Sequence, residues 1–441
     1  MQMCPSPEFD RVASVTTPVN PTKKYQALIW LVVSLCVSAI ALLYARQILA
    51  PWAEARDAQK GGLQAQMGDI YPRWVGAREL LLYRHNPYGP EVSHEIQMAY
   101  YGHIVTDEES RTRVVDEQRF AYPVYVVFLL APTIHMDFAT VQKWAPFVLG
   151  AFAGLSVLFC VGLLEWSMPW TMVAALVLFT LSSSQIEQGI RHQQFALVVG
   201  FLLVAGAWCV HKGHLLSGGV LLALATIKPQ MVLLPLVWFL IWTLGEWRSR
   251  WRLPASFGGT LALLVIAGEI LLPGWLRDFI AGMAAYRKYF PTTSVLRLLL
   301  GDWLGIAVSS VIIVWLLIYG GTRRKVGGDS RNFTLTFAAF LIVTVITFPL
   351  FTPFNQVLLI LPALLVLQEW ASVPRLSRLA FVAVICWPWI TSTALLLWKI
   401  PVNPANRIPL IPAVAASLLP LLLPVILFTR KSDVLSQVEG A

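Results

Sequence analysis

Apolar residues occur along this chain in long runs that are separated by short segments rich in Pro, Gly and charged residues. Runs of this kind are typical of helices that cross a lipid bilayer, because about 20 apolar residues span its hydrocarbon core. The first run is 27–49, and the later ones are 121–134, 143–164, 168–184, 194–211, 215–228, 230–245, 256–273, 303–320, 333–350, 356–369, 379–398 and 408–428. The pattern predicts an all-α integral membrane protein with about 12 transmembrane helices.

These runs divide the chain into three parts. We expect one polytopic transmembrane domain over residues 26–429, preceded by a disordered cytoplasmic tail (1–25) and followed by a second cytoplasmic tail (430–441). Residues 50–118 are too polar to cross the membrane and form a long extracytoplasmic loop between the first two spans. The run at 121–134 then begins the second span, with Pro123 early in that helix.

Composition and charge support this assignment. The chain is 57% hydrophobic and 13% charged, whereas about 25% of the residues of a soluble domain are charged. The net charge of +9 would indicate nucleic acid as partner of a soluble protein. Here, Lys and Arg gather in connections such as 246–252 and 323–325, which the positive-inside rule assigns to the cytoplasm. The loop 50–118 instead has eleven acidic and seven basic residues. We therefore expect no nucleic-acid partner and a place in the cell inner membrane.

Several apolar runs are shorter than the roughly 17 residues that a straight spanning helix needs, which predicts re-entrant or broken segments. Two arrangements of residues 165–245 follow. With strict alternation, 215–245 is one helix and the polar cluster 191–194 lies inside. Alternatively, 168–184 is re-entrant and 215–245 is broken at Lys228-Pro229-Gln230, so that both polar clusters face outside. The second arrangement accounts for the short runs and for the proline.

Ionisable side chains inside a membrane are costly and are candidate functional residues. Lys228 has apolar neighbours on both sides, so it is either a lysine that snorkels from a helix end or a cation that binds a phosphate or carboxylate at a helix break. Arg191 and His192 precede a helix, where cations and free N–H groups favour anions. An ordinary interfacial loop is the alternative for these two residues.

Asp69 opens a helical pattern within the long loop, in which Ile70, Trp74, Ala77 and Leu81 form a narrow apolar stripe. The stripe predicts a helix that lies on the outer membrane surface. Asp is a favoured N-cap residue, so a purely structural role for Asp69 is the alternative to a chemical one. The chain has no P-loop, no GxGxxG before a helix, no HExxH and no Cys/His metal spacing. We expect no metal site and no nucleotide-binding domain.

These polar segments stand in the order and spacing of the motifs of glycosyltransferase family 87, which the chain resembles over residues 27–370. The family's outer-loop pattern corresponds to Asp69 through Tyr88. Its F-x-Y-P pattern corresponds to Phe120-Ala121-Tyr122-Pro123, and its K-P-Q break to Lys228-Pro229-Gln230. Its G-Q-x-N pattern is only partly present, because residues 192–195 read His-Gln-Gln-Phe and keep the glutamine alone.

The resemblance implies a GT-C-type polytopic bundle that transfers a sugar on the extracytoplasmic face. The donor would be a hexose or pentose on a polyprenyl phosphate, the acceptor a glycan or glycolipid, and no cofactor would be needed. Enzymes of this kind are generally inverting and use one outer-loop carboxylate as base, which maps onto Asp69. The residues expected to bind the donor phosphate or sugar are Lys228, Gln230, Arg191, His192, Gln193, Arg73 and Tyr122. Possible further substrate contacts are Tyr88, Arg287, Lys288 and Asn355.

Two other classes of protein fit the hydropathy pattern. A transporter or lipid flippase also has many spans and buried cations, but such folds usually contain two related halves. No internal repeat is evident here, and the long first loop has no counterpart in the second half. A polymerase or ligase of lipid-linked glycans, or a non-catalytic assembly partner, is the third possibility. Ligases tend to have their large loop late in the chain, whereas this loop is early.

Overall fold

A computed structural model describes residues 21–59, 67–106, 108–109, 118–289, 293–350, 352–399, 403–414 and 418–429. The described chain is predominantly helical and has no strand, which confirms the all-α prediction. The tails predicted at 1–25 and 430–441 lie outside the described residues, except that 21–25 belong to the first helix.

Six helical segments of the described chain are long and apolar enough to cross a membrane. The first combines α1 (Pro21–Tyr44), the π-turn η1 (Ala45–Leu49) and α2 (Ala50–Gln59), so that it continues into the predicted outer loop. The other five are α7 (Phe138–Leu163), α14 (Arg252–Leu271), α17 (Asp302–Thr322), α20 (Arg375–Leu397), and the segment of η7 (Ile408–Leu410), α21 (Ile411–Val414) and α22 (Leu419–Thr429).

Shorter apolar helices stand between the long ones, as the short hydrophobic runs predicted. They are α8 (Trp170–Leu181), α10 (Ala196–His211), α11 (Leu215–Leu224) with η4 (Ala225–Ile227), α12 (Pro229–Gly245), α18 (Arg331–Thr347), and η5 (Pro353–Leu359) with α19 (Ile360–Gln368). The chain breaks between η4 and α12, at Lys228. The single helix over 215–245 is therefore wrong, and the predicted break at Lys228 is confirmed.

The centre of the bundle is built around α10 and α18. Of the 16 residues of α10, 14 are buried, as expected of a helix that is apolar on all sides. Phe333, Phe337 and Phe340 of α18 are fully buried, and Phe333 and Phe340 pack against Trp238 of α12. Close packing of α11 on α14 depends on Gly219, since a Cβ there would overlap Ser256 and the α14 backbone.

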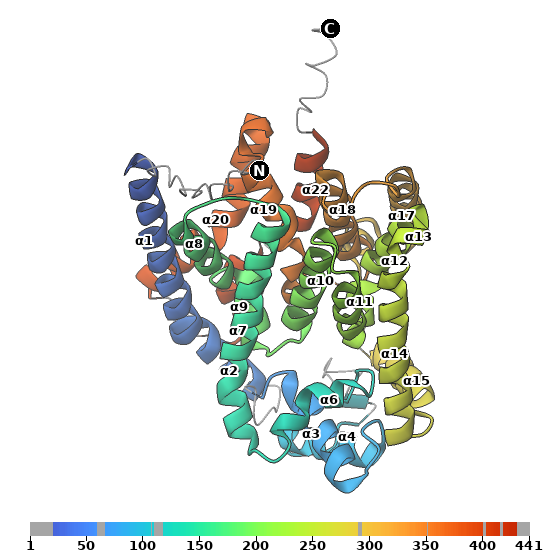
Figure 1. Cartoon of the computed structure of the whole chain (residues 1–441). Helices are drawn as coiled ribbons and strands as arrows, with labels where there is room; N and C mark the ends of the chain where they lie inside the picture. Colours follow the sequence, from blue (N-terminus) through green and yellow to red (C-terminus); the bar gives the residue numbers. More distant parts are fainter. Residues whose placement is uncertain are drawn as a thin grey trace, which may run out of the picture.

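A layer of short helices closes one end of the bundle (Figure 1). This α3 layer consists of α3 (Ile70–Arg78), the π-turn η2 (Glu79–Tyr83), α4 (Pro90–Tyr101), α6 (Val126–Leu130) and η3 (Ala131–Thr133). The helix predicted after Asp69 is present, but seven of the nine residues of α3 are buried. It lies inside the protein rather than on a membrane surface. The narrow apolar stripe indicated less burial than α3 has, because α4, α6 and α7 cover this helix from several sides.

The segment 121–134 is not the second span. Only its five residues 126–130 form an α-helix, and this helix belongs to the α3 layer (Figure 1). Pro123 and Pro132 limit its length, and Trp74 of α3 donates a hydrogen bond to Thr133 O at 3.2 Å. The next long helix after α1 is therefore α7, and the connection between the two is longer than the predicted 50–118 loop.

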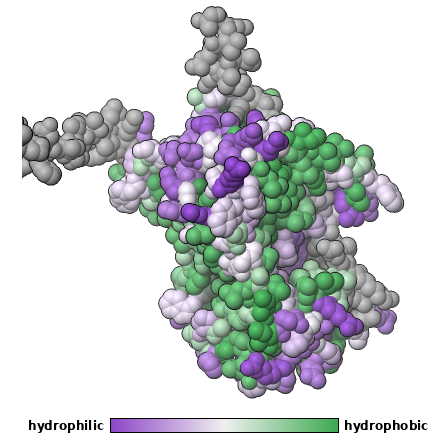
Figure 2. Space-filling view, turned by 45° about the vertical axis from the view of Figure 1, so that its right-hand side comes forward, coloured by the Kyte–Doolittle hydropathy of each residue, from purple (hydrophilic) through white to green (hydrophobic). Residues whose placement is uncertain are grey.

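The remaining helices connect the ones already described. They are α9 (Ser184–Arg191), α13 (Trp247–Arg250), α15 (Trp275–Tyr289), α16 (Val295–Leu300) and η6 (Trp370–Ser372). On the face seen in Figure 2, hydrophobic side chains form a broad area between hydrophilic clusters toward the two ends. Such a surface is expected of a multi-pass membrane protein.

Candidate functional site

Asp69 lies in the turn that leads into α3, at the N-cap position, but its side chain makes no capping hydrogen bond. The backbone around it is held instead. Its N–H donates to the carbonyl of His192 at 2.9 Å, and its own carbonyl accepts from Nη1 of Arg73 at 2.8 Å. The capping role considered from the sequence is therefore wrong, and the half-buried carboxylate is available for chemistry.

Lys228 occupies the break between η4 and α12 and is only 6% exposed. Its Nζ donates to Oδ1 of Asn355 at 3.0 Å and to Oε1 of Gln194 at 3.3 Å, and it lies 5.0 Å from the centre of the Phe354 ring. A lysine that snorkels toward solvent would be exposed, so that alternative is wrong. Within the described residues no carboxylate contacts this amine, and a buried cation held by neutral oxygens is suited to an anionic ligand.

Asp69 and Lys228 share one electrostatic environment although they come from different parts of the chain. The charge of the Asp69 carboxylate acts on Lys228, His192 and Tyr122. Arg73, one turn after Asp69, also acts on Lys228 and Tyr122. The predicted outer-loop carboxylate and the predicted cation are linked through one segment, since Asp69 N–H donates to His192 O at 2.9 Å and Lys228 donates to Gln194, two residues further on, at 3.3 Å.

The turn between α9 and α10 joins these two groups. Nη2 of Arg191 donates to Nε2 of His192 at 2.9 Å, and Nε of Arg191 lies 3.8 Å from Oε1 of Glu187. A guanidinium group can only donate, so Nε2 is an acceptor and His192 is neutral. Burial, followed by the charge of Arg191, lowers the pKa of His192 to about 4. Of the two residues expected to be cations here, only Arg191 is charged.

Gln193 and Gln194 have different roles. Gln193 has a left-handed backbone (φ 53°), its Nε2 donates to Gln142 O at 3.4 Å, and its side chain packs against Gly68. Gln194 is the residue that contacts Lys228. The partly matching motif had directed the donor-binding assignment to Gln193 alone. Because the backbone is left-handed at Gln193, Gln194 rather than Gln193 faces the lysine, and the sequence motif does not reveal this.

Tyr122 lies over Arg73, whose guanidinium carbon is 4.8 Å from the ring centre. The ring also packs edge-on against Phe195, and burial raises its pKa to about 12. Its backbone carbonyl accepts a hydrogen bond from the hydroxyl of Tyr88 at 2.7 Å. Tyr88 therefore positions the Tyr122 segment, and its hydroxyl is already used within the protein.

Among the other predicted site residues, only Gln230 has a described side chain, and it makes none of these contacts. Gln230 is half-buried in the first turn of α12. Arg287 and Lys288 belong to α15, but their side chains lie outside the described part of the structure. Phe354 is not among the predicted site residues, although it directly precedes the predicted Asn355. Its ring lies beside the Lys228 amine, which a turn pattern does not indicate.

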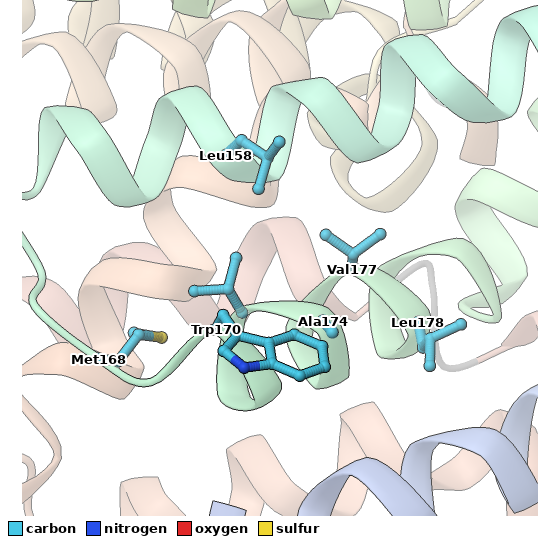
Figure 3. Close-up of a pocket in the computed structure, with 7 residues that line it drawn as sticks. Leu158, Met168, Trp170, Ala174, Val177 and Leu178 are labelled. Atoms are coloured by element: carbon cyan, nitrogen blue, oxygen red, sulfur yellow. The ribbon is translucent and has the colours of Figure 1, made fainter. Parts of the chain in front are cut away.

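An apolar groove of about 660 Å³ lies elsewhere, between α7 and α8. Leu158 of α7 faces Trp170, Val177 and Leu178 of α8 across it (Figure 3). Its lining contains no titratable side chain, so it provides no group for acid–base chemistry or for binding a phosphate. Among the described residues no set of three His, Cys, Asp or Glu side chains is arranged to hold a metal ion.

The polar site therefore consists of a carboxylate, a buried lysine and amide groups from the α9–α10 turn and η5. Two of these parts, the buried lysine and the α9–α10 turn, fall within residues 120–353, which match the family model of glycosyltransferase family 87. The chain belongs to glycosyltransferase family 87. Membership in family 87 indicates a glycosyltransferase that acts on a sugar donor and an acceptor. Neither the curated proteins nor the solved structures include a match to the chain.

The family 87 match contains Tyr122, the Arg191–Gln194 turn and Lys228, and it ends two residues before Asn355. Asp69 and Arg73 precede the matched region. They join the site through the hydrogen bond from Asp69 N to His192 O, which links the α3 layer to the matched bundle.

Proposed function

We propose that the protein transfers a hexosyl or pentosyl group from a polyprenyl phosphate to an extracytoplasmic glycan or lipid acceptor, with Asp69 as general base. The observation that carries the proposal is the buried amine of Lys228, which donates to the side-chain oxygens of Asn355 and Gln194. The charge of the Asp69 carboxylate, which makes no capping hydrogen bond, acts on this amine. The arrangement supplies a base and a cation for a leaving phosphate.

The chemistry needs these two groups. An acceptor hydroxyl becomes a competent nucleophile when a positioned carboxylate takes its proton, which is the role proposed for Asp69. The leaving group is a phosphate, and its charge is stabilised by preorganised cations and N–H donors. Lys228 and Arg191 are the proposed cations. Attack by the acceptor on the face opposite the leaving phosphate would invert the configuration of the transferred sugar.

The proposal includes a GT-C-type bundle of about 12 membrane helices, made from the long and the shorter apolar helices together. It also includes a plasma-membrane location with the α3 layer outside. The arrangement of basic residues supports this orientation. Arg250, in the connection before α14, donates to the carbonyls of Arg324 and Val326 in the connection before α18, both at 2.8 Å. These basic connections lie at the end of the bundle opposite the α3 layer (Figure 1).

The test is transfer from a panel of radiolabelled polyprenyl-phosphate sugars by purified wild-type protein and by Asp69→Asn. Wild-type transfer with at least one donor, and its loss in Asp69→Asn, is the expected result. Glu91→Gln is the matched control, since Glu91 is an exposed carboxylate of α4 in the same layer. Full transfer by folded Asp69→Asn would overturn the assignment of the base.

A further inference from the structure

The residue before Asp69 has a backbone conformation that only glycine adopts readily. Gly68 has φ +62°, and a Cβ at this position would lie 2.7 Å from Oε1 of Gln193. The Gln193 side chain thus rests directly on the glycine. Gly68 and Asp69 are therefore placed by contacts with the rest of the protein rather than by the regular geometry of α3.

The peptide groups on both sides of Asp69 are held by hydrogen bonds to the α9–α10 turn, to α4 and to α3 itself. Its N–H donates to His192 O at 2.9 Å, and its carbonyl accepts from Arg73 at 2.8 Å. The carbonyl of Gly68 accepts the hydroxyl of Tyr100 at 2.5 Å and the N–H of Tyr71 at 3.2 Å. The hydroxyl contact is the shorter of the two, so Tyr100 has the stronger influence on the direction of this carbonyl.

Tyr100 is well suited to hold a backbone group. It is 8% exposed in the last turn of α4, and its ring packs edge-on against Tyr71 at 5.7 Å. A tyrosine with a packed ring has few rotamers left, so its hydroxyl is fixed in space. Because the carboxylate of Asp69 makes no capping hydrogen bond, its position depends on this backbone and on its own side-chain torsions.

We infer that Tyr100 is a positioning residue, which places the Asp69 carboxylate by holding the carbonyl of Gly68. The inference rests on the proposed function, in which Asp69 is the general base. Tyr100 does not touch the reacting atoms. Its hydroxyl acts through the Gly68–Asp69 peptide, and its removal leaves the second hydrogen bond of that carbonyl, from Tyr71, in place.

Tyr100→Phe tests this directly, because it removes the hydroxyl and keeps the packed ring. We expect kcat to fall about tenfold with the donor KM unchanged, since a small displacement of a catalytic group is enough to slow the chemical step. Tyr71→Phe is the matched control. Tyr71 belongs to the same aromatic cluster, and within the described residues its hydroxyl makes no hydrogen bond. Its kcat should equal that of the wild type.

A double-substitution cycle separates positioning from general loosening of the fold. Asp69→Glu moves the carboxylate by one methylene group, and a mobile backbone tolerates this better than a fixed one. We expect the losses of activity from Tyr100→Phe and Asp69→Glu to be non-additive. Asp69→Glu should cost less activity in the Tyr100→Phe protein than in the wild type. Three results would each overturn the inference. The two losses could be additive, Tyr100→Phe could have the same kcat as Tyr71→Phe, or Tyr100→Phe could lower only the thermal stability. An Asp69→Asn variant that retains transfer would instead overturn the proposed function.

Discussion

The amine of Lys228 donates a hydrogen bond to Oδ1 of Asn355, so the two residues tie the break before α12 to the start of η5. An amide oxygen satisfies the donor without neutralising its charge. A carboxylate in the same place would form an ion pair and reduce the attraction for a phosphate. The choice of asparagine thus keeps the cation available for a ligand.

Replacement of Lys228 by glutamine should lower the transfer rate by about 10²- to 10³-fold, as does loss of one donor to a developing anion in other enzymes. Glutamine can still donate to Asn355, but it has no charge for the leaving phosphate. The measurement is kcat with the active donor from the panel. Lys325→Gln, at an exposed position in the connection before α18, should have the wild-type rate. Wild-type activity in Lys228→Gln would remove the lysine from the mechanism.

Gly68→Ala should reduce both stability and activity. The left-handed backbone costs roughly 1–2 kcal/mol with any Cβ, and this Cβ would also displace the Gln193 side chain. Gly213→Ala separates the two effects, because Gly213 also has a positive φ (+77°) but has no atom within 4 Å of the added Cβ. Thermal unfolding in detergent should show a loss in both variants, whereas transfer should fall only in Gly68→Ala. Equal activity in both would count against a role for this contact.

His192 should make stability depend on pH. Its pKa is about 4 in the folded protein, against 6.5 for an unperturbed histidine. Between these values the unfolded chain binds more protons, so stability rises with pH over this window and is lost as the pH falls from 6.5 toward 4. The unfolding temperature of His192→Gln should therefore change less between pH 4.5 and pH 7 than that of the wild type. Exposed His214 is the control, and His214→Gln should keep the wild-type profile. An unchanged slope in His192→Gln would contradict the neutral, buried state.

Arg250 should contribute to stability and not to transfer. Its guanidinium donates to the carbonyls of Trp242, Arg324 and Val326 and lies 3.9 Å from the Trp242 ring centre. Lysine cannot reproduce this planar set of contacts. We expect Arg250→Lys to cost about 2 kcal/mol, seen as a lower unfolding temperature with kcat unchanged. Arg248→Lys, at an exposed position two residues away, should alter neither quantity.

The helices and the break at Lys228 were predictable because they depend on local patterns. Runs of apolar residues identify buried helices, and a proline after a lysine interrupts one. The place of residues 121–134 in the α3 layer, rather than in a membrane span, was not predictable in this way. Its apolar residues suit a membrane span and the buried interior of the α3 layer equally well, and only the tertiary packing of Trp74 and Phe138 around it distinguishes the two.

The site was predictable in part. Asp69 and Lys228 were identified from motifs, but their proximity depends on contacts between segments that the sequence does not encode locally. The choice between Gln193 and Gln194 turns on one left-handed backbone angle. Tyr100 gives no signal in the sequence, since its role comes from a hydroxyl that meets a carbonyl 32 residues away.

The distance along the chain between Lys228 and Asn355 has a consequence for biosynthesis. Asn355 is synthesised 127 residues after the lysine, whereas the other partner, Gln194, precedes the lysine by 34 residues, so the amine has only one of its two hydrogen-bond acceptors until the segment with η5 emerges. A nascent polypeptide released before that point retains Asp69, the complete α3 layer and Gln194, but its buried amine lacks the acceptor that Asn355 provides. Assembly of the site therefore waits for the later part of the chain, and a chain truncated before η5 differs from the complete one in the hydrogen bonding of this buried amine.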